Sequence, residues 1–235
     1  MKKKVKYIIA CLLMMPFQVS AQDKAEMTLR ADIVSQYVWR GLNLGSASVQ
    51  PTLGVSWKGL SLSAFGNMGF VDLSDPREID LIGCYTTGGL SIGVIDYWMN
   101  DPVSQYFRYK AHATSHVFEA FAGYDFGPVS VSWQTNFAGN DGRTKSGKRA
   151  YSSYFEIAAP FRFVTCDWQA SLGMVPYATD YYDVNHFAVV NVGLRATKEL
   201  RITDHFSLPL FAQVVANPDS KHAYFVFGLT LNAFQ

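Results

Sequence analysis

The sequence predicts an all-β chain, a single transmembrane antiparallel up-and-down β-barrel of about 12 strands that follows a cleaved signal peptide. Apolar and polar residues alternate with a period of two in segments of about ten residues. Aromatic residues gather near the ends of these segments, and no apolar run after the first 21 residues is long enough for a membrane helix. Charged residues make up 17% of the chain, below the average of about 25%.

Residues 1–21 have the pattern of a secretory signal peptide. Lys2, Lys3, Lys4 and Lys6 precede a short apolar run, and small residues end at Ala21. We therefore expect a single mature domain, residues 22–235. A lipoprotein site at Cys11 is a weaker alternative, because the apolar run continues beyond this cysteine.

The alternation is clearest in 48–58, where Val49, Leu53, Val55 and Trp57 take turns with polar or small residues. No segment has sustained helical spacing. The same alternation predicts twelve strands, near 28–40, 47–58, 60–70, 77–87, 89–98, 115–126, 128–138, 150–160, 163–175, 186–197, 205–215 and 222–234.

The predicted connections are tight and long in turn. Tight turns are expected at 58–59, 87–88, 127–128 and 160–162, whereas 100–114 and 139–149 are long and polar. Outer-membrane barrels place tight turns in the periplasm and long loops outside, so both termini are expected to be periplasmic. The segment 198–204 is an exception, a longer connection on the tight side.

The aromatic residues at the apolar positions of the alternation, which we call the apolar or outward phase, form two groups, one near each end of the strands. A membrane barrel carries such aromatic girdles at its two interfaces, whereas a periplasmic β-sandwich, the competing fold, has no reason to sort rings by strand end. The expected girdle residues are Tyr37, Trp39, Trp57, Phe70, Tyr85, Trp98, Tyr124, Phe137 and Tyr151. Gly41 would then begin the first external loop.

The remaining positions of the alternation, the inward phase, place ionisable residues inside the barrel. The candidates are Arg30, Asp32, Arg40, Lys58, Glu78, Asp80, Glu119, Glu156, Asp167 and Arg195. Charges in a barrel interior must be paired or hydrated. Two interpretations stay open: the charges brace the wall as pairs, or some of them line a water-filled path that favours cations.

Twelve strands about 4.8 Å apart and tilted by about 40° give a backbone radius of roughly 12 Å. Inward side chains fill about half of this radius, so both a narrow channel and a plugged barrel fit. The inward phase carries rings that could close the lumen: Phe65, Phe121, Tyr154, Phe187 and Phe211.

The charge balance and the cysteines exclude other classes. Residues 1–21 hold four lysines and no acid, so 16 basic and 19 acidic residues remain, which argues against nucleic acid as a partner. Cys84 lies on the inward phase and Cys166 on the outward phase, so no disulfide is expected. The spacings suggest neither a metal site nor a cofactor.

The opening strands resemble a known family. The run SQYVWRG at 35–41, followed by Gln50-Pro51, Gly54 and Gly59, resembles the TorF-like porins, as does the Gly93–Tyr97 run. The resemblance covers roughly 29–98 and implies a small outer-membrane porin. Phe234 stands next to last, one position away from the terminal aromatic residue of many such barrels.

These observations favour a channel for passive diffusion of small polar solutes across the outer membrane, with membrane lipid and solutes as partners. The alternative is a closed structural or adhesive barrel whose external loops bind another protein. A lipid-modifying enzyme is a third hypothesis, suggested by His112, Ser115, His116 and Glu119. It is weak because His116 and Glu119 fall on opposite faces of one strand, so we expect no enzyme.

Overall fold

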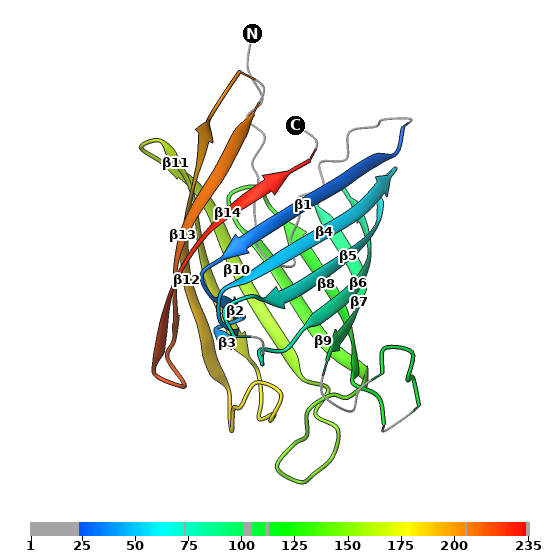
Figure 1. The fold of residues 1–235 in the computed structure, drawn as a ribbon. Coiled ribbons are helices and arrows are strands. Elements are labelled where there is room, and N and C mark those ends of the chain that lie inside the picture. Colours follow the sequence, from blue (N-terminus) through cyan, green and yellow to red (C-terminus); the bar gives the residue numbers. More distant parts are fainter. Residues whose placement is uncertain (1–23, 73, 101–104, 111–112, 205, 234–235) are drawn as a thin grey trace.

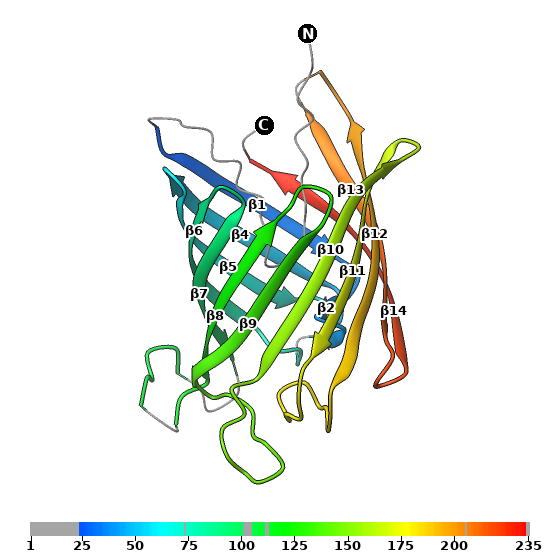
Figure 2. The same cartoon turned by 180° about the vertical axis from the view of Figure 1, so that it is seen from behind.

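The computed structural model describes residues 24–72, 74–100, 105–110, 113–204 and 206–233. Twelve strands close into one antiparallel barrel, and a two-stranded hairpin lies between the first two of them in sequence (Figures 1 and 2). The barrel strands are β1 (Glu26–Val34), β4 (Ser48–Trp57), β5 (Leu60–Gly69), β6 (Glu78–Thr87), β7 (Leu90–Met99), β8 (His116–Asp125), β9 (Ser130–Gly139), β10 (Ser153–Phe163), β11 (Cys166–Val175), β12 (Ala188–Arg201), β13 (Ser207–Asn217) and β14 (His222–Asn232). The hairpin consists of β2 (Tyr37–Trp39) and β3 (Leu42–Gly45).

The predicted barrel of twelve antiparallel strands is confirmed. Neighbours in sequence pair with one another, and β1 closes the ring by pairing with β14 on one side and β4 on the other. Among the described residues, none forms a helix long and apolar enough to cross a membrane. The predicted signal peptide and Cys11 lie outside the described residues.

The prediction of one strand over 28–40 is wrong. β1 ends at Val34, and the chain then turns into the barrel, where Trp39 pairs with Leu42 across a two-residue turn. Arg40 and Gly41 form this turn with φ values of +48° and +79°. Two consecutive positive φ values are typical of the tight hairpin turn that matches strand twist.

Two connections also differ from the prediction. β10 continues through Pro160 to Phe163, so the turn is at 164–165 and not at 160–162. β10 pairs with β9 only as far as Ala158. Pro160 has no N–H to donate, but no hydrogen bond to β9 is lost because the pairing with β9 has already ended. β12 extends to Arg201 and pairs with β13 along 192–201, so most of the expected 198–204 loop is strand.

The two faces of the wall differ in the way the alternation predicts. Large apolar side chains stay exposed on the outer face, for example Leu29, Leu53, Leu62, Leu81 and Val94. Polar and charged side chains are buried on the inner face, among them Gln50, Thr52, Asn67, Glu78, Asp80, Glu119, Ser132, Gln134 and Asn136. The barrel is therefore apolar outside and polar inside.

The two ends of the barrel are also different. β1 begins and β14 ends at the end that carries the short turns, and the long connections lie at the other end (Figure 1). The hairpin enters the barrel from the end of β1, on the side of the long connections (Figure 1).

Candidate functional site

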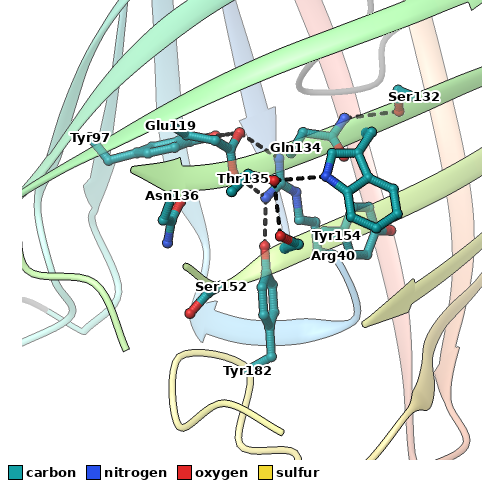
Figure 3. A network of polar contacts seen from close by, with 12 residues as sticks. Arg40, Tyr97, Glu119, Ser132, Gln134, Thr135, Asn136, Ser152, Tyr154 and Tyr182 are labelled. Atoms are coloured by element: carbon teal, nitrogen blue, oxygen red, sulfur yellow. Dashed lines mark hydrogen bonds and ion pairs between the residues drawn. The ribbon is translucent and has the colours of Figure 1, made fainter. Parts of the chain in front are cut away.

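The centre of the site is an ion pair inside the barrel between the hairpin turn and the wall. The Arg40 guanidinium donates to both carboxylate oxygens of Glu119 on β8, over 2.6 and 2.9 Å. It also donates to the Tyr182 hydroxyl at 2.6 Å, and Tyr97 on β7 donates to the same carboxylate at 3.1 Å. Figure 3 shows Arg40 between Glu119 and Tyr182. This two-pronged geometry is the strongest arrangement of an arginine–carboxylate pair.

Aromatic rings enclose this ion pair. Trp39 stacks on Tyr182 with ring centroids 5.9 Å apart and meets Tyr97 and Tyr181 edge-on. The Arg40 guanidinium lies 4.4 Å from the Trp39 ring centroid and 4.8 Å from that of Tyr154 on β10. Burial raises the pKa of the Tyr182 hydroxyl, so this residue of the β11–β12 connection stays neutral beside the charged pair.

Further contacts hold the hairpin on other sides of the lumen. The Tyr37 hydroxyl donates to Glu78 on β6 at 2.7 Å. At the turn, the Gly41 carbonyl accepts from the Asn217 amide on β13 at 3.2 Å. Gly41 also lies so close to β12 that a Cβ atom there would be 1.7 Å from the Val190 carbonyl oxygen. Only glycine fits at this approach.

The hairpin crosses the lumen and fills it near the end with the long connections. Its hydrogen bonds, ring contacts and closest backbone approach reach β6, β7, β8, β10, β12 and β13. One apolar cluster joins the hairpin to the wall and includes Tyr37, Trp39, Ile95, Tyr97, Val117, Tyr154, Val175, Tyr182 and Val190. Arg40 is only 7% exposed and Glu119 is fully buried, so the ion pair itself is shielded from solvent.

Most candidate interior residues lie on the inner face of the wall. Arg30, Asp32, Glu78, Asp80, Glu119, Glu156, Asp167 and Arg195 occupy the inward phase of their strands. Their role as pore-lining residues stays a prediction. Arg40 is inside as expected but belongs to the hairpin, and Lys58 lies in a turn beside the Trp57 ring. Phe65, Tyr154 and Phe211 are buried rings of the interior, whereas Phe187 is exposed.

The expected positions of two girdle residues are wrong. Tyr37 and Trp39 are 3% and 7% exposed because the hairpin carries them into the barrel, away from any lipid interface. The sequence has one signal for this path, since Arg40-Gly41 followed by Leu42 and Leu44 continues the alternation across a two-residue turn. The expected girdle residues Trp57, Phe70, Tyr85, Tyr124, Phe137 and Tyr151 are exposed.

Trp98 lies on the outer face but is covered by the 105–110 segment. Its ring packs edge-on against Tyr106, with ring centroids 5.3 Å apart. Beneath the same segment, the buried His116 bonds through Nδ1 to Asp96 at 2.7 Å and through Nε2 to the Tyr106 carbonyl. Sequence periodicity cannot predict this contact, because it joins two strands and a loop that only the fold brings together.

The residues suggested for an enzyme are not assembled into a catalytic group in the described part of the chain. Glu119 bonds to Arg40 inside the barrel, whereas His116 is on the outer face with both ring nitrogens in hydrogen bonds. His112 lies outside the described residues. Cys84 faces the interior from β6, and Cys166 is on the outward phase of β11. Within the described ranges there is no cluster of three or more His, Cys, Asp or Glu side chains that could bind a metal ion.

Comparisons with known proteins give only a weak likeness of fold. No family model matches the sequence, and no curated protein matches it. A porin structure refined at 1.8 Å resolution is similar with a TM-score of 0.37 and 12% identity, over 80% of this chain and 62% of that chain. Salmonella typhi OmpF in complex with daunomycin is similar with a TM-score of 0.36 and 9% identity, over 88% of this chain and 97% of that chain. This chain thus spans about three fifths of the length of the first of these porins.

Proposed function

We propose that this chain is an outer-membrane β-barrel that passes small polar solutes, and that the β2–β3 hairpin is its gate. The outer wall supports the membrane location. Most barrel strands have ten or eleven residues, the length with which a tilted strand crosses a bilayer. Their outer faces expose leucine and valine side chains that would otherwise meet water. The resemblance of 29–98 to the TorF-like porins agrees with this role.

The end with the short turns would lie in the periplasm together with both termini, because barrels of this kind keep their long loops outside. The hairpin would then close the external half of the lumen. Beside the apolar cluster, an ion pair, a phenol hydroxyl and a backbone carbonyl bond the hairpin to the wall, and water can replace these polar contacts when the hairpin moves. Rehydration of the separated charges offsets much of the lost attraction. A gate of this composition can open at lower cost than an apolar plug.

The buried Arg40–Glu119 pair is the observation that carries this proposal, because it joins the hairpin to the wall inside the barrel. Removal of the hairpin tests the proposal. Val34 pairs with Ser48, so a two-residue Asn-Gly turn can replace residues 35–47 without a change of barrel register. We expect the intact protein to show rare or small conductance events in planar bilayers and the shortened protein to show frequent, larger ones.

Folding of the shortened barrel is checked first: a folded barrel migrates differently on a gel before and after boiling. A folded barrel that conducts no ions without its hairpin contradicts the channel. A shortened protein that fails to fold is replaced by Trp39→Ala, which removes the largest ring of the hairpin and keeps the chain length.

A closed barrel that binds a partner through its long loops is the second candidate. The filled layer around Trp39 and Tyr182 favours it, since this packing resembles a stable protein core. The same conductance experiment separates the two functions, because the closed barrel predicts no conductance from the intact protein and no gain from Trp39→Ala.

A further inference from the structure

A cavity lies inside the barrel beside the hairpin, on the side of the short turns. The centres of water-sized spheres can occupy about 50 Å³ of it, and the empty space around them, open solvent included, is about 500 Å³. Six polar or charged residues line it: Arg30, Asp32, Gln36, Gln50, Arg195 and Gln213. They come from β1, β4, β12 and β13 and from the segment that leads into β2, so the cavity exists only in the closed barrel.

The charge of this lining is positive. Arg30 and Arg195 face a single carboxylate, that of Asp32, which accepts a hydrogen bond of 2.6 Å from Thr230. The acidic residues Glu78 and Glu119 bond to the hairpin. A cation path was one of the two interpretations that the sequence left open, and the two arginines against one carboxylate favour an anion in this part of the lumen.

The surrounding structure orients Arg195 and leaves a buried donor of Arg30 available. The Arg195 guanidinium lies 3.5 Å from the centroid of the Phe211 ring, which fixes the guanidinium plane. The Arg30 Nε–H is buried and has no hydrogen-bond partner among the described residues. A buried donor without a partner costs free energy, and an acceptor in the cavity would remove this cost.

The rest of the lining is apolar apart from Tyr37, whose hydroxyl donates to Glu78. Val34, Phe65, Phe211 and Val226 border the cavity beside the arginines. An anion with a hydrocarbon body would meet both kinds of surface, whereas a bare inorganic anion would use only the charged side. A guanidinium matches the two oxygens of a carboxylate.

We propose that this cavity binds small organic carboxylates, with the carboxylate on the guanidinium groups of Arg30 and Arg195 and the hydrocarbon part against Phe211 and Val226. The inference that the protein passes such carboxylates rests on the proposed function. The inference that the cavity binds them does not, because binding needs no movement of the hairpin.

Isothermal titration calorimetry on the full-length folded barrel in detergent tests the proposal. The probes are benzoate, benzamide and benzamidine, which share one ring and differ in charge, together with inorganic phosphate. We expect benzoate to bind at least about tenfold more tightly than the other three probes. Arg30→Gln and Arg195→Gln should each weaken benzoate binding about tenfold or more, and Arg30→Lys should weaken it less than Arg30→Gln.

Arg162→Gln is the matched control, because Arg162 is an exposed arginine of β10 that does not line the cavity. Each variant must keep the heat-dependent gel mobility of the folded barrel. Equal binding of benzoate and benzamide would overturn the proposal, as would phosphate binding as tight as that of benzoate, or benzoate binding unchanged in both glutamine variants. The titration measures no flux, so a barrel that binds benzoate but never conducts would contradict only the channel.

Discussion

Arg40 and Glu119 are 79 positions apart in the sequence and meet inside the barrel through two hydrogen bonds of 2.6 and 2.9 Å. One residue belongs to the turn of a short hairpin and the other to the wall. This contact makes the segment between β1 and β4 an interior element, although its position in the sequence is that of an external loop. The gate proposal depends on this difference.

Loss of either partner of this pair should destabilise the barrel. Glu119→Gln leaves the Arg40 guanidinium buried without a counter-charge, which costs about 3–5 kcal/mol in such pairs. We expect a fall of this order in the free energy of unfolding, measured by urea titration of protein folded into lipid vesicles. Arg162→Ala is the control: it breaks an exposed pair with Asp167 at 3.9 Å, and the change should stay below about 1 kcal/mol. Equal effects of the two substitutions would contradict a buried pair.

A methyl group at the hairpin turn should open the gate. Gly41→Ala places a Cβ atom 1.7 Å from the Val190 carbonyl oxygen, so the turn must move away from β12. We expect more frequent conductance events in planar bilayers. Gly127→Ala is the matched control, because Gly127 also has a positive φ but no atom near its added Cβ. If the two variants conduct alike, strain at a positive φ and not the contact with β12 explains the effect.

Brominated acyl chains should distinguish the two environments of tryptophan. Trp133 is exposed on the outer wall of β9, whereas Trp39 is inside the barrel. In single-tryptophan proteins reconstituted into brominated lipid, we expect strong quenching of Trp133 fluorescence and little quenching of Trp39. Strong quenching of Trp39 would place this ring in the lipid girdle and contradict the interior hairpin.

The contact of His116 with the Tyr106 carbonyl should hold the 105–110 segment on the outer wall. His116 bonds through Nε2 to the Tyr106 carbonyl of the segment and through Nδ1 to Asp96 of the neighbouring wall strand, so His116→Ala removes the bond from the wall to this segment together with the bond that orients the ring. We expect faster trypsin cleavage at Arg108 and Lys110, observed by mass spectrometry. His222→Ala, a substitution of an exposed histidine in β14, should leave the rate unchanged. An unchanged rate in both variants would mean that the contact does not hold the segment.

The alternation could predict the twelve wall strands and the inward phase of residues such as Glu78 and Glu119, because a period of two is a local property of an extended chain. It could not place Tyr37 and Trp39. An alternating segment looks the same whether its apolar side meets lipid or the rings of Tyr97 and Tyr182. Only the path of the chain after Val34 decides between the two, and this path depends on partners from distant strands.

The site could be predicted only in part for the same reason. Arg40 was a candidate for the interior, but its partner lies on a strand far along the sequence, and six acidic residues shared the inward phase. The outer contact of His116 was missed because it needs Tyr106, a residue of a loop whose position no periodicity describes.

A double-mutant cycle on Arg40 and Glu119 tests the interior hairpin most directly. The free energy of unfolding is measured in lipid vesicles for the parent, Arg40→Ala, Glu119→Ala and the double variant. Contacting residues of one ion pair give interaction energies of about 0.5–3 kcal/mol, and a buried pair with two bonds should lie near the upper limit, at about 2 kcal/mol or more. An interaction energy near zero would show that the two side chains do not meet, and the hairpin would then lie outside the lumen.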